Sequence, residues 1–195
     1  MISREVYELL ISWFVISFCF AFTFNIVKLA YMLPISLLTA GLGFIVHELS
    51  HRYVARRYGC IAYYRMWTWG LMLALITSII SGGSIIFAAP GAVYITYPVY
   101  WYGADRALRR IHGLIALSGP ASNIILSILF YIVSKLGGIF YLIGIMGFKI
   151  NIWLAIFNLI PFPPLDGSKV FTYSIKTWII AIIIALALNT ILPRL

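Results

Sequence analysis

The chain has 195 residues, of which 63% are hydrophobic and only 10% are charged, and it carries a net charge of +9. Soluble domains contain about 25% charged residues. This composition therefore excludes a soluble globular protein and predicts an all-α polytopic membrane protein. The basic residues stand at the ends of apolar segments, where membrane proteins carry them, so they do not indicate nucleic-acid binding.

At about 20 apolar residues for each spanning helix, the length allows about five or six transmembrane helices in one membrane domain. The first is expected over residues 9–24. It reads as a retained helix and not as a signal peptide, because Glu5 and Glu8 precede it and no small-x-small cleavage site follows it. Both carboxylates are expected to be solvated at the membrane interface. A second helix is expected over residues 35–58, directly after a proline that suits a first helical turn.

Short strands are predicted between the second and third long helices. Residues 61–67 are rich in aromatic and β-favouring side chains. Residues 70–81 are apolar but short for a span, which leaves open whether they cross the membrane. Two β-like runs, 84–87 and 92–97, flank the turn signal Pro90-Gly91, and together they predict a small membrane-embedded β-hairpin. Such backbone is tolerated at membrane depth only where protein or water covers it.

The second half of the chain predicts a third long helix over residues 111–134, with the small residues of 118–123 near its start, where they allow close helix packing. A further apolar helix ends at Leu159. The proline-rich segment 161–167 cannot be helical throughout. A last helix is expected over residues 177–192.

Lysine and arginine counts predict the orientation in the cell membrane, because these residues favour cytoplasmic loops. Two connectors are basic, one after the second helix and one before the third, and their residues are Arg52, Arg56, Arg57, Arg65, Arg106, Arg109 and Arg110. We therefore expect a multi-pass protein whose second helix ends on the cytoplasmic side.

That second helix contains the pattern H-E-x-x-H, from His47 through Glu48 to His51. On a helix this spacing sets two imidazoles one turn apart with a carboxylate beside them. Such groups in hydrocarbon are costly unless they are paired or bind a metal. A hydrolytic zinc site uses three protein ligands and keeps one position open. The pattern thus predicts one Zn²⁺ per chain, with Glu48 as general base and a third ligand from elsewhere.

Few other side chains can supply the third ligand: His112, Glu5, Glu8, Asp105 and Asp166. Asp105 stands beside Arg106 and reads as a solvated charge, as the first two glutamates do. Asp166 follows three prolines and precedes Gly167, so a turn can aim it inward, where an unpaired carboxylate would be destabilising. Asp166 is favoured on this ground, and His112 stays as the alternative.

Three motifs in this order resemble the site-2 protease family of intramembrane zinc metalloproteases, over about residues 35–170. They are the H-E-x-x-H pattern, the segment Gly-Pro-Ala-Ser-Asn at 119–123, and the segment Asn-Leu-Ile-Pro-Phe-Pro-Pro-Leu-Asp-Gly at 158–167. The resemblance implies a catalytic core over this range, with the first and last helices peripheral to it. Many members of the family carry a PDZ or CBS domain, and no segment here fits either.

The resemblance also assigns roles to single residues. It implies that the zinc ligands are His47, His51 and Asp166, that Glu48 is the catalytic acid and base, and that Asn158 and Pro161 handle substrate. The predicted hairpin, including Ala92 and Val93, resembles the membrane-embedded sheet that is proposed to hold substrate in this family. Asn123 or Asn158 is a candidate to bind the substrate backbone or the developing oxyanion. Interhelical packing is the alternative role for each.

The predicted function is therefore an intramembrane zinc metalloprotease that cleaves within or near transmembrane segments of membrane-protein substrates. A substrate helix must unwind before attack, since its carbonyls are shielded in helical hydrogen bonds, and strand addition to the hairpin would favour the unwound form. Two other classes stay open, a membrane zinc transporter and a catalytically inactive scaffold that binds helices. The sequence identifies neither the substrate nor the oligomeric state.

Overall fold

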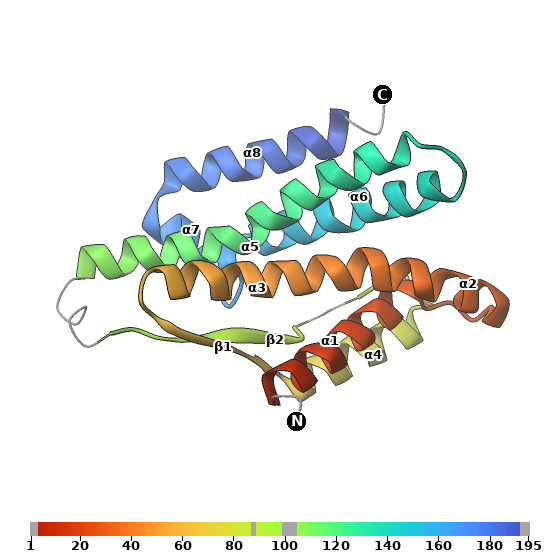
Figure 1. The fold of residues 1–195 in the computed structure, drawn as a ribbon, viewed down its shortest axis with the longest axis horizontal. Helices are drawn as coiled ribbons and strands as arrows, with labels where there is room; N and C mark the ends of the chain where they lie inside the picture. The colour runs from red at the N-terminus through yellow and green to blue at the C-terminus, as the bar shows by residue number, and fades with distance from the viewer. Residues whose placement is uncertain (1–3, 87–88, 99–104, 192–195) are drawn as a thin grey trace.

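The computed structural model describes residues 4–86, 89–98 and 105–191. Its elements in chain order are α1 (Arg4–Ala21), α2 (Ile26–Ser36), the π-helical turn η1 (Leu37–Gly41), α3 (Leu42–Arg57), β1 (Ile61–Met66), α4 (Thr68–Ile80), β2 (Gly91–Thr96), α5 (Asp105–Ser134), α6 (Gly138–Asn158), α7 (Asp166–Tyr173) and α8 (Ile175–Ile191). Helix α3 runs through the middle of the molecule, with α5, α6 and α8 on one side and α1, α4 and the two strands on the other (Figure 1). Residues held by α3 can therefore meet groups from both sides.

Within these described ranges, three helices are long and apolar enough to cross a membrane: Ile26–Arg57, Arg106–Ser134 and Gly138–Asn158. This is fewer than the about five or six that the length allows. The segments expected at 70–81 and 177–192 form helices α4 and α8 of only 13 and 17 residues, and Leu192 lies outside the described residues. Helix α1 begins earlier than residue 9, so that Glu5 and Glu8 belong to it.

The second spanning helix starts well before the predicted residue 35. It begins at Ile26, where the Asn25 side chain accepts a hydrogen bond from the Lys28 amide at 2.9 Å and caps the first turn. The helix then passes through Pro34, which cannot donate to the carbonyl one turn earlier. The π-helical turn η1 follows directly, as such turns often do where the regular hydrogen-bond ladder is interrupted.

The two strands form an antiparallel pair in which Tyr64 stands opposite Val93. The predicted strands at 61–67 and 92–97 are thus confirmed, but the predicted hairpin between 84–87 and 92–97 is wrong. Residues 84–86 form no strand, and Phe87 and Ala88 lie outside the described residues. The Pro90-Gly91 signal does not close a hairpin. Instead, the Pro90 carbonyl accepts the Trp67 amide at 2.8 Å and joins the end of β1 to the start of β2.

The C-terminal half of the chain brings a distant carboxylate back to α3. Helix α5 continues through Pro120 to Ser134, and α6 ends at Asn158. The proline-rich stretch after α6 is not helical, as predicted, and α7 begins with Asp166. Trp178 of α8 donates its indole N–H to the Leu159 carbonyl at 2.7 Å. This contact secures the segment that leads to Asp166.

Candidate metal centre

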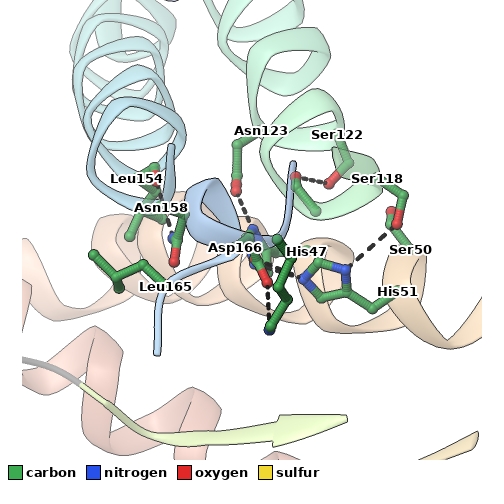
Figure 2. Close-up of polar contacts among 12 residues, drawn as sticks. His47, Ser50, His51, Ser118, Ser122, Asn123, Leu154, Asn158, Leu165 and Asp166 are labelled. Carbon is green, nitrogen blue, oxygen red and sulfur yellow. Dashed lines mark hydrogen bonds and ion pairs between the residues drawn. The ribbon is translucent and has the colours of Figure 1, made fainter. Parts of the chain in front are cut away.

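Three predicted ligands meet in the structure. His47 and His51 lie one turn apart on α3, and Asp166 reaches them from the first turn of α7 (Figure 2). The Oδ2 atom of Asp166 is 3.2 Å from His47 Nε2 and 3.0 Å from His51 Nε2, and the two Nε2 atoms are 3.0 Å apart. All three residues are buried. In the part of the chain that the structure describes, these three side chains form a cluster that could hold a metal ion.

The hydrogen bonds behind the rings determine which nitrogens carry protons. His51 Nδ1 is 2.7 Å from the Ile115 carbonyl, which can only accept, so Nδ1 carries the hydrogen. His47 Nδ1 is 2.7 Å from Asn123 Oδ1. The Asn123 amide nitrogen faces two acceptors, the Gly43 carbonyl at 3.1 Å and Asn151 Oδ1 at 2.9 Å, which fixes its oxygen toward His47. Both Nε2 atoms thus direct a lone pair at the Asp166 carboxylate.

Three electron-pair donors that face one another without a hydrogen between them need a cation, since their mutual repulsion in a buried site is otherwise uncompensated. Two imidazole nitrogens and one carboxylate oxygen are a donor set that suits Zn²⁺, and such histidines usually give their other N–H to a backbone carbonyl or a side-chain oxygen. The residues therefore fit a zinc ion with three protein ligands.

Gly119 of α5 keeps the neighbourhood of these nitrogens open. A Cβ atom at this position would stand 2.5 Å from His51 Nε2 and 2.6 Å from His47 Nε2. Only a residue without a side chain leaves room for an ion at the two rings. Gly119 and Asn123 are thus residues of the segment 119–123 that contact the histidines.

We expect the substitution Gly119→Ala to weaken zinc binding by more than the roughly 10- to 100-fold that changes behind the ligands cost, because the methyl group competes with the ion for space. Elemental analysis of zinc per chain, after dialysis against graded chelator concentrations, measures the effect. Ser122→Ala is the matched control, since the Ser122 hydroxyl bonds within its own helix, to the Gly119 carbonyl at 2.7 Å. Equal zinc retention by the two variants would contradict this role of Gly119.

The Glu48 carboxylate is buried beside the ligands but is not one of them. Its Oε2 atom makes no hydrogen bond to any part of the chain that the structure describes. A buried carboxylate oxygen without a partner is costly, so such an atom is expected where water or a substrate completes its bonds. The Oε2 atom of Glu48 is thus available to water or to a ligand next to the metal site.

The metal site opens into a cavity of about 200 Å³. Its walls come from α1, α3, β2, α5, α6 and α7, and they include Glu48, Ala92, Val93 and Asn158. The Asn158 amide nitrogen donates one hydrogen bond, to the Leu154 carbonyl at 3.0 Å, which leaves its oxygen and a second hydrogen for a ligand. Pro161 is exposed and is not among the lining residues.

Several sequence-based assignments change in the structure. His112, the alternative ligand, lines the cavity but does not join the three converging ligand atoms. Asn123 uses both amide hydrogens on Gly43 and Asn151, so it orients His47 and has no donor left for substrate. Glu5 and Glu8 are not simply solvated, because both accept hydrogen bonds from β1 amides.

Two residues near the site are missing from the sequence-based set. Asn151 of α6 is fully buried and holds the Asn123 amide in place, and its only signal in the sequence is a carboxamide in the middle of an apolar helix. Lys169 stands one turn after Asp166 and donates to its Oδ1 atom at 3.2 Å, away from the histidines. A carboxyl group must be ionised to serve as a metal ligand, and the Lys169 ammonium beside Oδ1 favours the ionised form of Asp166.

The sequence is similar to two proteins whose names state an activity. It is 43% identical over 180 residues to "Putative zinc metalloprotease MJ0611" of Methanocaldococcus jannaschii, an alignment that covers 91% of this chain and 88% of that protein. It is 26% identical over 152 residues to "Putative zinc metalloprotease YwhC" of Bacillus subtilis, which covers 71% of this chain and 68% of that protein. No protein-family model matches the sequence. No solved structure matches it either.

Proposed function

Because the chain belongs to the zinc metalloprotease family of these two relatives, we propose that it is an intramembrane protease of the site-2 protease type. It hydrolyses peptide bonds within or near the transmembrane segments of membrane-protein substrates. One observation carries the proposal: His47, His51 and Asp166 converge beside Glu48, whose Oε2 atom has no partner among the described residues, in a cavity walled by apolar helices. A soluble hydrolase does not require helices that are long and apolar enough to cross a membrane.

The residues around the cavity have separate tasks in this proposal. His47, His51 and Asp166 hold Zn²⁺, which when bound supplies Lewis-acid activation of water and of the scissile carbonyl. Glu48 takes a proton from the attacking water and passes it to the leaving amine. Asn158 offers its free amide groups to the substrate backbone. Asn123 keeps His47 in the tautomer that leaves Nε2 free.

The edge of β2 offers a place for an unwound substrate. In an antiparallel pair, opposite residues alternate between those that bond each other and those whose backbone groups point away. The Tyr64 amide of β1 points away from β2, because it bonds to Glu5 at 3.1 Å. Its register partner Val93 must then also direct its N–H and C=O away from β1. Since Val93 lines the cavity, an extended peptide that pairs with this edge lies beside Glu48.

We further propose a multi-pass protein of the cell membrane with the catalytic site toward the cytoplasm. The helix that carries the metal ligands ends with Arg56 and Arg57 in its last turn, and Lys and Arg favour cytoplasmic ends. His51 is within two turns of this basic end. Water therefore has a short distance to travel to the site from the cytoplasmic face.

Purified protein in detergent should cut a model transmembrane peptide inside its apolar segment. The cut should disappear when a zinc chelator is added and return when zinc is restored, because Glu48 needs the Lewis acid in order to deprotonate water near neutral pH. Mass spectrometry of the products locates the cut. A peptide that stays intact, or a cut that survives removal of the metal, would overturn the proposed function.

A further inference from the structure

Two carboxylates of α1 bind the outer edge of β1, which is the edge that faces away from β2. Glu5 Oε1 accepts the Tyr64 amide at 3.1 Å, and Glu8 Oε2 accepts the Met66 amide at 3.1 Å. From the end of α3, the Arg56 guanidinium donates to the Ala62 carbonyl at 2.9 Å. Three of the backbone groups that β1 turns outward are thus paired with side chains of two helices.

The two carboxylates in these contacts are charged groups that are buried or partly buried. Glu8 is only 5% exposed, and its Oε1 atom is neutralised by Arg4 at 2.7 Å and Arg65 at 3.1 Å. Glu5 pairs with Arg52 at 3.2 Å. A carboxylate that is buried costs free energy unless it is both paired and hydrogen-bonded. The second carboxylate oxygen of Glu8, Oε2, accepts the hydrogen bond from the Met66 amide, which lies far away in the sequence.

Within the described residues, the outer edge of β1 is thus partly blocked by side chains, whereas the outer edge of β2 pairs with no other strand. Exposed strand edges accept further strands, and proteins block the edges that must stay unpaired. Neighbouring strands lie about 4.8 Å apart. A peptide on the outer edge of β1 would therefore lie roughly 14 Å, or three strand spacings, from one on the edge of β2. Of the two edges, only that of β2 lines the cavity with Glu48.

We propose that Glu5 and Glu8 are positioning residues for substrate, which fix the sheet against α1 so that the free edge of β2 stands at the cavity. This inference rests on the proposed function, because it assigns the held edge to a peptide substrate. It makes α1 a part of the substrate-binding apparatus, although α1 contributes no metal ligand.

The kinetic test compares the double variant Glu5→Ala, Glu8→Ala with the wild type on the model transmembrane peptide. KM should rise at least about tenfold, the effect of losing one hydrogen bond to a charged acceptor, while kcat changes less and zinc per chain stays the same. The variant Glu5→Ala, Glu8→Gln should regain most of the affinity that the double alanine variant loses, since the glutamine amide oxygen still accepts the Met66 N–H. Arg4→Gln is the control, because it removes a charge from Glu8 and leaves both strand contacts intact.

A cross-linking test does not depend on turnover. Ile61 and Thr96 are opposite each other in the register, one on each strand. A disulfide needs Cα atoms within about 7 Å, so with an added mild oxidant a cysteine-bearing peptide on the edge of β2 should form a disulfide with Thr96→Cys and not with Ile61→Cys. The reaction at Thr96→Cys should fall about tenfold when Glu5 and Glu8 are both alanine. Glu48→Gln is used as the background, so that the peptide is not cut.

The outcomes separate the two proposals. If the wild type does not cut the peptide, the proposed function fails. If the wild type cuts it, but the double variant keeps its KM and its cross-link at Thr96→Cys, only the role of Glu5 and Glu8 fails. Should the double variant lose zinc as a sign of misfolding, Glu5→Ala alone is measured, since the Glu5 side chain is more exposed than that of Glu8, at 18% against 6%.

Discussion

Replacing Glu48 with Gln is expected to lower the cleavage rate by about 10²- to 10⁴-fold, the usual contribution of a general acid and base, while zinc per chain stays at the wild-type value. Glutamine has the shape of glutamate but cannot take a proton from water. Glu48 is also not among the three ligand atoms that converge on the metal site. Initial rates on the model peptide and elemental analysis of the same preparation measure both quantities.

The matched control is Asp166→Ala, which removes a ligand and should lose zinc and cleavage together. The pair separates chemistry from metal binding and also discriminates between the classes of function. A zinc transporter would keep its flux into liposomes in Glu48→Gln and lose it in Asp166→Ala. An inactive scaffold would show no cleavage even in the wild type. Unchanged cleavage by Glu48→Gln would remove Glu48 from the mechanism.

The metal site could be predicted from the sequence because a short stretch of it shows both the ligand spacing and polar side chains that would be unstable in an apolar segment without a partner. Two histidines at a spacing of four residues share one helix face wherever the helix packs, and a histidine in an apolar segment needs a partner. The third ligand followed from the few acids in the chain, and Asp166 does meet the pair. The residues behind the ligands are different. Asn151 acts through Asn123 from another helix, and no local spacing links the two.

The sheet shows the limit of such local reasoning. Residues 84–87 and 92–97 are close in the chain and flank a turn signal, which favours a hairpin. The partner of β2 is instead β1, which precedes α4. Strand pairing is decided by the surfaces on which both strands pack, and these come from distant elements. The burial of Glu8 could not be predicted for the same reason, because it depends on Arg65 and the Met66 amide, more than 50 residues away.

Val93→Pro is expected to lower cleavage of the transmembrane peptide roughly 10- to 100-fold without loss of zinc. Val93 directs its N–H toward the free edge of β2, so proline removes a donor that an added peptide strand would use, and a partner left unpaired costs about 1–3 kcal/mol. Proline is tolerated on an edge strand when its nitrogen faces outward. The ladder to β1 should therefore survive. Ala92 is a poorer position for this test, because its amide faces Arg65 across the ladder.

Val93→Ala is the control for this substitution, because it shortens the same side chain but keeps the backbone N–H. If substrate binds by strand addition, Val93→Ala should cut the peptide at close to the wild-type rate and Val93→Pro should not. The separation should also appear in the cross-link at Thr96→Cys, which reports the bound peptide without chemistry. Cleavage by Val93→Pro at the rate of Val93→Ala would mean that the peptide reaches Glu48 without the β2 edge, and the cavity would then hold substrate through side chains alone.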